Sequence, residues 1–260
     1  MGFIEKTKAW LTELTELIYV PRCASCFAVL PTKETALCKS CSDAYLTESK
    51  RLCARCGMVH KMCTCRVEYD GIRIPITHIT GYDIRRSSVS KNIILRLKDN
   101  NYGGAFDFLA NEMLTALKER YVRLFERGGV VITYVPRSKR AKRKAGHDQS
   151  EQLAKRISKA SGAPLVPLFE NVSRSYQKAL NRAERSENAR KGYRLISPEL
   201  KLDDRIVVII DDIVTTGASI GACASLARRN GAKLVIGLVC AKAISRKGIG
   251  EEDLPDRMYS

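Results

Sequence analysis

The chain alternates short apolar runs with longer amphipathic stretches. Three of the runs are rich in β-branched residues and show no polar alternation, which is typical of strands buried on both faces. They occupy residues 130–135, 206–210 and 234–239, and a shorter strand is predicted at residues 79–82. Apolar residues at helical spacing predict helices at residues 90–97, 103–125, 148–160 and 219–230. Strands that alternate with helices predict an α/β fold with a mainly parallel sheet flanked by helices.

The first 20 residues form a separate pattern. Phe3, Trp10, Leu14 and Leu17 recur at helical spacing and predict an amphipathic helix over residues 1–20. This helix packs on the rest of the chain, or it docks on a partner or a membrane surface. Three glutamates interrupt the segment, which argues against a secretory signal. No apolar run reaches the roughly 20 residues that span a bilayer, so we expect a cytoplasmic protein.

Eight of the ten cysteines lie between residues 23 and 65. They form four close pairs: Cys23 and Cys26, Cys38 and Cys41, Cys53 and Cys56, and Cys63 and Cys65. A C-x-x-C turn places two sulfurs where both reach one tetrahedral zinc ion, and two such turns complete the four ligands. Disulfides are not expected in a reducing compartment, so the spacing predicts one or two structural zinc ions. The simplest assignment is sequential, but interleaved pairing or a contribution from His60 is compatible with the spacing.

Basic residues outnumber acidic ones by 45 to 28, which gives a net charge of +17. A chain this basic attracts polyanions such as nucleic acid, phosphorylated small molecules or anionic lipid. Residues 137–194 contain 16 basic and 5 acidic residues, so this stretch carries +11 of the net charge. With Tyr176 and Tyr193 interleaved, the stretch could follow a single strand by phosphate contacts and base stacking. A solvated basic face is the alternative.

The residues after the strand predicted at 206–210 have the composition of a phosphate-binding loop. In parallel α/β sheets, ligands bind beyond the carboxyl ends of the strands. Hydroxyls come from Thr215, Thr216 and Ser219, and Gly217 permits a left-handed backbone conformation. The start of the next helix adds free N–H groups and the positive end of a dipole. The segment therefore predicts a small phosphate cradle, although it lacks the Gly-Lys-Ser/Thr of a P-loop.

Two acids precede this cradle. Asp211 and Asp212 cannot face a phosphate, but they can accept hydrogen bonds from vicinal sugar hydroxyls or lie near a metal ion. An acidic pair beside an anion cradle therefore favours a sugar phosphate as the ligand.

Residues 208–219, with the sequence VIIDDIVTTGAS, closely resemble the 5-phosphoribosyl-1-diphosphate (PRPP) loop of type I phosphoribosyltransferases. With the cysteine-rich segment in front, the chain is similar to the ComF family, which contains the ComFC-like competence proteins. Further similar segments are Leu97-Lys98, Val135-Pro136-Arg137, Gly146-His147-Asp148-Gln149 and a stretch at residues 177–188. The resemblance implies a type I phosphoribosyltransferase fold with a small N-terminal zinc-ribbon domain. Along the chain we expect the N-terminal helix at residues 1–20, a double zinc ribbon at 21–68, a phosphoribosyltransferase-like domain at 69–245 and a tail at 246–260.

The resemblance also implies an activity, the transfer of ribose 5-phosphate from PRPP to a nucleophile with Mg²⁺ and release of pyrophosphate. Such a protein is a pentosyl-transferring glycosyltransferase, and Asp211 and Asp212 are its implied catalytic residues. The implied PRPP-binding residues are these two acids with Thr215, Thr216, Gly217, Ala218, Ser219, Arg137 and Lys98. The chain departs from the family pattern at Ala145 and His147, where an arginine and an aromatic residue are usual. This departure affects the expectation of turnover more than that of PRPP binding.

For the biological role, the resemblance implies DNA uptake in natural transformation, with single-stranded DNA and other competence proteins as partners. In an alternative, the protein is a non-catalytic single-strand binder with a regulatory PRPP site, and Arg182, Arg185 and Arg190 are the candidate DNA contacts. A second alternative is nucleotide salvage, because the same fold serves that chemistry. The sequence does not indicate which acceptor receives the ribosyl group.

Overall fold

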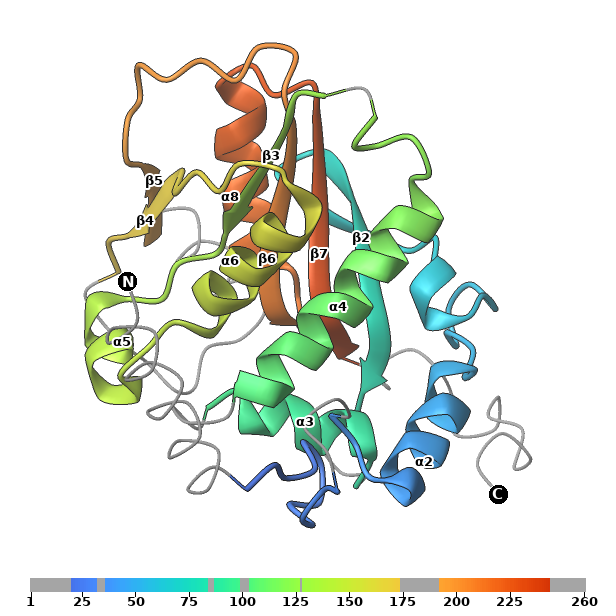
Figure 1. Ribbon diagram of the computed structural model, residues 1–260. Helices are drawn as coiled ribbons and strands as arrows, with labels where there is room; N and C mark the ends of the chain where they lie inside the picture. The colour runs from blue at the N-terminus through green and yellow to red at the C-terminus, as the bar shows by residue number, and fades with distance from the viewer. Residues whose placement is uncertain are drawn as a thin grey trace, which may run out of the picture.

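The computed structural model describes residues 20–31, 36–83, 87–98, 103–126, 128–173 and 192–243. Within these residues the chain forms a five-stranded sheet in the order β1-β2-β7-β6-β3. Its strands are β1 (Arg66–Tyr69), β2 (Ile72–Tyr82), β3 (Val130–Tyr134), β6 (Ile206–Val214) and β7 (Leu234–Ala243). β2, β7, β6 and β3 run parallel, and β1 pairs antiparallel with β2 (Figure 1). The predicted α/β fold with a mainly parallel sheet is confirmed.

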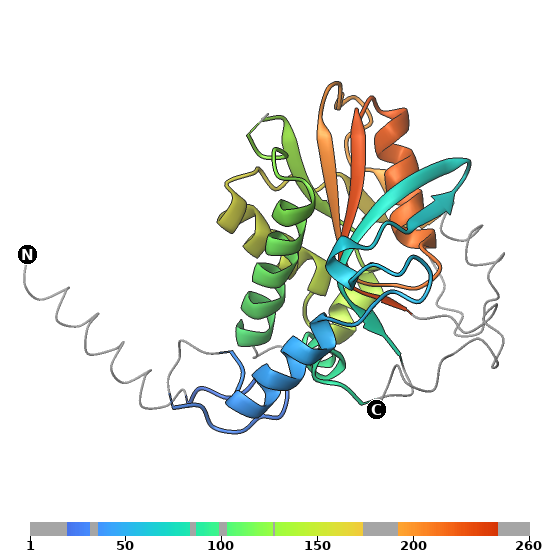
Figure 2. The same ribbon diagram turned by 90° about the vertical axis from the view of Figure 1, so that its right-hand side faces the viewer.

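Helices cover both faces of this sheet. α4 (Gly103–Arg120) and α6 (Gln149–Ser161) lie on one face, with α3 (Val89–Arg96) beside the lower end of α4 (Figure 1). α8 (Ala218–Arg229) lies on the other face, as the turned view in Figure 2 shows. The sheet is therefore the middle of three layers, and its central strands are shielded from solvent on both sides.

Strand β6 shows why the central strands are apolar without alternation. Val208 and Ile210 belong to the core between the sheet and α4, α6 and α3, whereas Val207 and Ile209 belong to the core under α8. All four side chains are fully buried. Successive side chains point to opposite faces of a strand, so a strand covered on both faces needs apolar residues at every position.

The cysteine-rich segment packs on the same body. It contains α2 (Lys39–Ser49) and the short 3-10 turn η1 (His60–Met62). The Tyr45 hydroxyl on α2 donates to Glu112 Oε2 on α4 at 2.8 Å. The buried Glu48 carboxylate accepts the N–H groups of Val89 and Ser90 at 2.8 and 3.0 Å, so α2 satisfies two free donors at the start of α3.

Three short elements were not expected from the sequence. α5 (Lys139–Ala145) follows β3, and β4 (Phe169–Asn171) pairs antiparallel with β5 (Tyr193–Leu195). Three-residue strands are too short to show a period of two. α5 has the sequence KRAKRKA and no buried residue, so it has no apolar face to recognise.

α2, η1 and β1 were likewise not predicted. The predicted strands and helices of the α/β body occur where they were expected, with different ends. The strand predicted at 79–82 begins at Ile72, and the strand predicted at 206–210 continues to Val214. β1 crosses the expected domain border between residues 68 and 69. Residues 1–19 of the predicted N-terminal helix and the tail at 246–260 lie outside the described residues. In the part of the chain that is described, no helix is long and apolar enough to cross a bilayer.

Candidate functional site

The two acids of the candidate PRPP loop lie on the last residues of strand β6. β6 continues to pair with β7 beyond residue 210, from Asp211 opposite Val239 to Val214 opposite Lys242. The expectation that the strand ends at residue 210 was therefore wrong, because β7 extends equally far and supplies the hydrogen-bonding partners. The acids still stand at the carboxyl end of the parallel sheet, where ligands of such folds bind.

Asp211 is held in one orientation by two donors. Ser150 Oγ donates to Asp211 Oδ1 at 2.9 Å, and the Asp212 N–H donates to the same oxygen at 3.0 Å. Burial raises the pKa of Asp211 well above its ordinary value, the neighbouring Asp212 carboxylate raises it further, and the Ser150 hydrogen bond opposes both. A carboxylate anchored through one oxygen can offer the other to a sugar hydroxyl. From the sequence, Ser150 was expected only to lie within the helix predicted at residues 148–160.

Residues 215–217 turn from β6 into α8. Gly217 directly precedes α8 with φ +80°, a left-handed conformation that favours glycine. The Thr216 hydroxyl accepts the Ala218 N–H at 3.3 Å, and Thr215 is exposed. The other N–H groups in the first turn of α8 have no partner inside the helix and can bind an anion. This geometry is compatible with the phosphate cradle that the sequence predicts.

Tyr193 brings a distant part of the chain to this cradle. It lies on β5, which contacts α8, and its hydroxyl lies near the side chains of Ser219 and Asn171. Burial raises the pKa of the Tyr193 hydroxyl, so it remains protonated and able to donate. The sequence suggested Tyr193 for base stacking. Its contact with the loop could not be predicted, because it depends on how the β4–β5 pair folds back over α8.

Asp148 joins the segment after β3 to the start of α6. It is the N-cap of α6, where its side chain accepts the Glu151 N–H at 3.4 Å, and it also accepts the Arg137 N–H at 2.8 Å. Burial raises the pKa of Asp148, and the two backbone hydrogen bonds oppose this effect. Ser150, in the first turn of α6, donates a hydrogen bond to Asp211. The start of α6 therefore positions both the Arg137 backbone and the acid pair.

His147 connects the same segment to α3. Its Nε2 lies 2.7 Å from the Leu97 carbonyl oxygen, and its Nδ1 lies 3.1 Å from the Ala145 carbonyl oxygen. A neutral imidazole carries a single N–H, so it donates to one of these carbonyls, and the Nε2 contact joins the residues before α6 to the end of α3. Lys98, the next residue after Leu97, is exposed beside the contact between His147 and Leu97.

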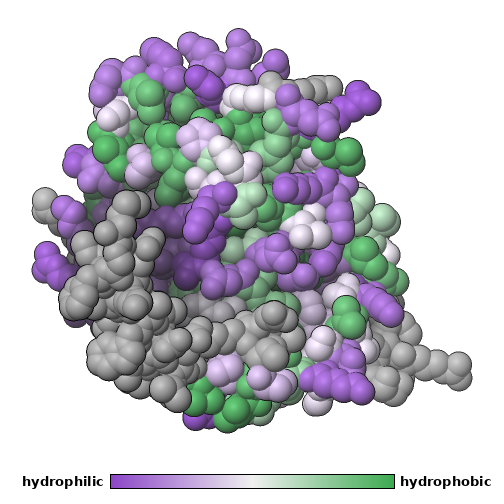
Figure 3. Space-filling model, viewed as in Figure 1, coloured by the Kyte–Doolittle hydropathy of each residue, from purple (hydrophilic) through white to green (hydrophobic). Residues whose placement is uncertain are grey.

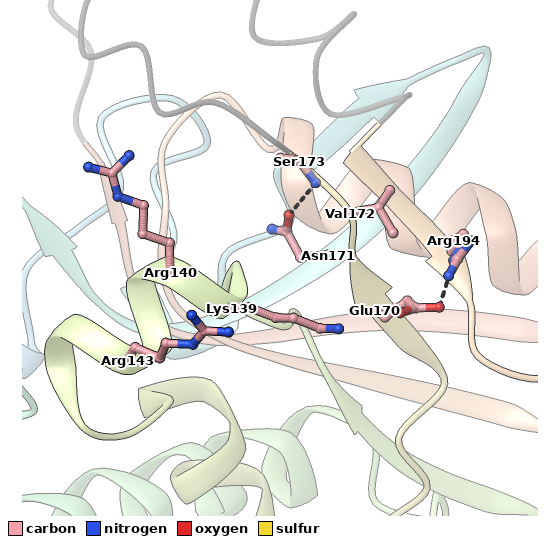
Figure 4. A pocket seen from close by; sticks show the side chains of 8 residues that line it. All are labelled: Lys139, Arg140, Arg143, Glu170, Asn171, Val172, Ser173 and Arg194. Carbon is pink, nitrogen blue, oxygen red and sulfur yellow. Dashed lines mark hydrogen bonds and ion pairs between the residues drawn. The ribbon is translucent and has the colours of Figure 1, made fainter.

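A basic cavity of about 400 Å³ opens between α5 and the β4–β5 pair (Figure 4). The residues that line it are Lys139, Arg140, Arg143, Glu170, Asn171, Val172, Ser173 and Arg194. Arg194 Nε pairs with Glu170 Oε1 at 2.6 Å on one wall, and Lys139 extends toward that wall from α5. The space-filling view also shows hydrophilic residues around a hollow on this side of the molecule (Figure 3). Four cations against one acid make the cavity suitable for phosphate groups.

The eight paired cysteines form two separate clusters of four. The first contains Cys23, Cys26, Cys38 and Cys41, and the second contains Cys53, Cys56, Cys63 and Cys65. Within each cluster, all sulfurs lie within 4.8 Å of one another, and individual pairs are separated by 3.6–3.8 Å. Zinc–sulfur bonds of about 2.3 Å in a tetrahedron require sulfurs about 3.8 Å apart, so both clusters are compatible with structural zinc. The sequential grouping is confirmed, and His60 belongs to neither cluster.

The thiols are prepared for metal binding. Burial alone raises the pKa of Cys23 and Cys56, but backbone hydrogen bonds outweigh it and lower both values to about 6. Zinc ligands bind as thiolates. The backbone donors around Cys23 and Cys56 therefore favour the thiolate form that zinc requires.

The second cluster rests on the sheet through polar contacts. His60 Nδ1 lies 3.4 Å from Nε2 of His78 on β2, and burial lowers the pKa of His60 to about 4 and that of His78 to about 3, which keeps both rings neutral. Lys242 Nζ on β7 is buried and has no hydrogen-bond partner within the described residues. Burial raises the pKa of Cys65, and the charge of Lys242 acts in the opposite direction. Lys242 thereby favours the thiolate form of Cys65.

The three candidate DNA contacts, Arg182, Arg185 and Arg190, lie outside the described residues, as does the family-like stretch at residues 177–188. Among the implied PRPP-binding residues, the structure brings together Asp211, Asp212 and the loop at 215–219. Arg137 joins this group through the backbone contact with Asp148 described above.

Comparison with known proteins identifies the family. The family model described as phosphoribosyl transferase domain matches residues 109–254, which is more than half of the chain. The chain therefore belongs to the phosphoribosyl transferase domain family. A relative, the DNA utilization protein YhgH of Escherichia coli K12, is 28% identical over 234 residues, covering 82% of this chain and 93% of the relative. This similarity, together with the two cysteine clusters, confirms the resemblance to the ComF family.

Two solved structures are also similar. A purine phosphoribosyltransferase from Pyrococcus horikoshii is 20% identical, with a TM-score of 0.33, and the match covers 52% of this chain and 74% of that one. A hypoxanthine phosphoribosyltransferase from Staphylococcus aureus is 12% identical, with a TM-score of 0.33, over 54% of this chain and 75% of that one.

Proposed function

We propose that this protein binds PRPP with Mg²⁺ and transfers its ribose 5-phosphate to an acceptor, as part of DNA uptake. The observation that carries the proposal is the order of three features along the chain. The acid pair lies near the end of β6, the left-handed Gly217 follows a few residues later, and the free N–H groups at the start of α8 come next. A single short segment thereby offers acceptors for a diol and donors for a phosphate. The 5′-phosphate would bind at residues 215–219, and Asp211 and Asp212 would accept the ribose hydroxyls.

The same residues would assist the departure of pyrophosphate. As it leaves, positive charge develops on the sugar, and the two carboxylates stabilise this charge at short range. Mg²⁺, when bound, would neutralise the diphosphate and the developing negative charge. Arg137 and Lys98 would add positive charge on the leaving-group side. Asp148 and Ser150 would hold the Arg137 backbone and Asp211 in place.

Two further assignments accompany this proposal. The two four-cysteine clusters would each hold one structural zinc ion, because all four ligands of each cluster come from the protein and leave no open position. The role in DNA uptake is supported by the similarity to a protein named for DNA utilization over most of the chain.

Titration calorimetry with PRPP and Mg²⁺ tests the site without requiring the acceptor. Replacing both acids (Asp211→Asn/Asp212→Asn) should weaken PRPP binding at least about 100-fold, since each charged hydrogen-bond acceptor contributes about 1.5–3 kcal/mol. The matched control is Asp203→Asn/Asp204→Asn, an exposed acid pair just before the same strand, at its opposite end. This control should bind PRPP like the wild type. Equal affinity in both variants would contradict the proposed site.

A second candidate function, binding of single-stranded DNA, is favoured by the basic cavity. Lys139, Arg140 and Arg143 line it from α5, and Arg194 lines it from β5. Phosphate contacts make affinity depend on salt, with a slope of about 0.7 for each phosphate that the protein neutralises on a single strand. Replacing Arg140 and Arg143 with glutamine, alone and with Arg182, Arg185 and Arg190, should therefore weaken binding and flatten its salt dependence.

Fluorescence anisotropy with a labelled oligonucleotide over a salt series measures both quantities. The control replaces two exposed cations at the end of α4 and just beyond it, Lys118→Gln/Arg123→Gln, which removes the same charge elsewhere. If the control weakens binding as much as the α5 variant, the affinity reflects net charge and the cavity is not the site.

A further inference from the structure

Strand β1 connects the second cysteine cluster to the candidate phosphate loop. Cys63 and Cys65 directly precede β1 (Arg66–Tyr69), which forms the edge of the sheet and pairs with residues 72–75 of β2. β1 lies next to α8 on the face opposite to α4 and α6 (Figure 2). The side chains of Val67 and Tyr69 are almost completely buried there.

These two side chains occupy the space next to two glycines of the loop and its helix. A Cβ atom added to Gly217 would lie 2.3 Å from Val67 Cγ1, and one added to Gly221 would lie 2.5 Å from Tyr69 Cγ. Such distances are shorter than any real contact, so Val67 and Tyr69 pack directly on the backbone. Val67 therefore packs directly against the left-handed turn at Gly217.

The turn after β1 holds the other end of the same helix. Asp70 Oδ2 pairs with Arg229 Nη2 at 2.6 Å and accepts a hydrogen bond from Ser225 Oγ at 3.4 Å. Residues 67–70 thus contact both ends of α8. Val67 packs on the N-cap residue Gly217, and Asp70 pairs with Arg229 in the last turn. A shift of β1 would remove support from the whole helix, including the N–H groups at its start.

β1 is held by its pairing with β2, by the core under α8 and, where the chain enters it from Cys63 and Cys65, by the second cluster. The apolar core of this cluster consists of Cys53, Cys63 and Cys65 with Cys56 packed against them. Among the described residues, these four cysteines form the apolar core of the segment, so its fold depends on metal at the cluster more than on apolar packing. By contrast, Cys23 and Cys41 of the first cluster join the large core that includes α4.

Arg120 fixes the cluster to the sheet at the same place. Its Nη1 donates to the Cys63 carbonyl at 2.5 Å and to the Ile76 carbonyl on β2 at 2.9 Å. The cluster is therefore attached at one side to α4 and β2, and it continues at the other side into β1.

We propose that the second cysteine cluster is the metal-dependent anchor of the phosphate loop, acting through Val67 and Tyr69 as positioning residues. Metal at this cluster keeps β1 against α8, and β1 keeps Gly217 and the helix start in the binding geometry. Loss of this metal lowers PRPP affinity although neither the metal nor β1 touches the ligand. The inference rests on the proposed function for its ligand, but the loop geometry can be tested without PRPP.

The experiment compares two pairs of variants by hydrogen exchange of residues 215–222, metal analysis and calorimetry with PRPP and Mg²⁺. In the first pair, Val67→Ala removes the side chain that packs on Gly217. Val207→Ala makes the same change in the same core, but at the far end of β6. In the second pair, Cys56→Ser and Cys26→Ser each remove one ligand, from the second and first cluster respectively. Metal analysis should give two zinc ions for the wild type and one for each cysteine variant.

Val67→Ala should exchange faster at residues 215–222 and bind PRPP about tenfold more weakly, as expected if the competent loop falls to about a tenth of the population. Val207→Ala should change neither quantity. Cys56→Ser should reproduce the effects of Val67→Ala, and Cys26→Ser should have a smaller effect on both. If Cys56→Ser fails to fold, the two valines still test the contact between β1 and the loop, and stepwise removal of zinc from the wild type with a chelator tests the dependence on metal.

Faster exchange in both Val67→Ala and Cys56→Ser, with Val207→Ala unchanged, would support the anchor. Wild-type exchange in a folded Cys56→Ser that has lost its zinc, or equal exchange and affinity in both valine variants, would overturn it. If the wild type does not bind PRPP, the proposed function fails, but the exchange data still test the anchor. The two failures are therefore distinguishable.

Discussion

Replacing Gly217 with alanine is expected to weaken PRPP binding at least about 100-fold. Two effects combine at this residue. A left-handed conformation costs a non-glycine residue about 1–2 kcal/mol, and the new Cβ would lie 2.3 Å from Val67 Cγ1. The loop must shift to relieve the contact, which moves the start of α8 away from the phosphate. Calorimetry with PRPP and Mg²⁺ measures the loss.

Gly162→Ala is the matched control. Gly162 also caps a helix with a left-handed φ of +74°, but no atom lies within 4 Å of the Cβ position. This variant has the backbone strain without the steric clash. Its free energy of unfolding should therefore be lower than that of the wild type, and its affinity for PRPP should be unchanged. The double variant Gly217→Ala/Val67→Ala should bind more tightly than the sum of the single losses predicts, because the two positions are in contact. Wild-type affinity in Gly217→Ala would show that the loop does not bind through this turn.

Glu48→Ala is expected to lower the free energy of unfolding by about 3 kcal/mol. The buried Glu48 carboxylate accepts three hydrogen bonds, from the N–H groups of Val89 and Ser90 and from the Ser90 hydroxyl. Alanine would leave these donors buried without partners and separate α2 from the start of α3. Urea unfolding with zinc present measures the change.

The control for Glu48 is Glu119→Ala, the same substitution at an exposed position on α4. Surface changes of this kind usually alter the free energy of unfolding by less than about 0.5 kcal/mol. Glu48→Gln should fall between the two, since its amide keeps one acceptor oxygen. If Glu48→Ala were no more destabilising than the control, the contact between α2 and α3 would contribute little to stability.

Much of the fold could be predicted from the chain itself. The apolar run at residues 206–210 predicts a strand covered on both faces, and β6 is such a strand, with Val207 and Ile209 on one face and Val208 and Ile210 on the other. The cysteine spacing predicts two groups of four, and the structure forms these groups. Each of these predictions depends on residues that are close in sequence, where the geometry of a strand or turn fixes their separation.

Parts of the candidate site could not be predicted. Ser150 is 61 residues from Asp211, and its hydrogen bond depends on α6 lying across the end of β6. Tyr193 reaches the loop from a three-residue strand with no periodic signal. The strand predicted to end at residue 210 reaches Val214, because β7 offers backbone partners that the local pattern does not reveal.

The sequence by itself determined the α/β class, the metal-binding pattern of the cysteines and the chemistry of Asp211 to Ser219, because these are properties of residue type and short spacing. Only the tertiary structure decided that Val67 packs against Gly217 and that Asp70 pairs with Arg229. The physical reason is that such contacts join segments about 150 residues apart, and they follow from strand order and helix packing. Packing of this kind is set by many side chains acting together, so no short motif encodes it.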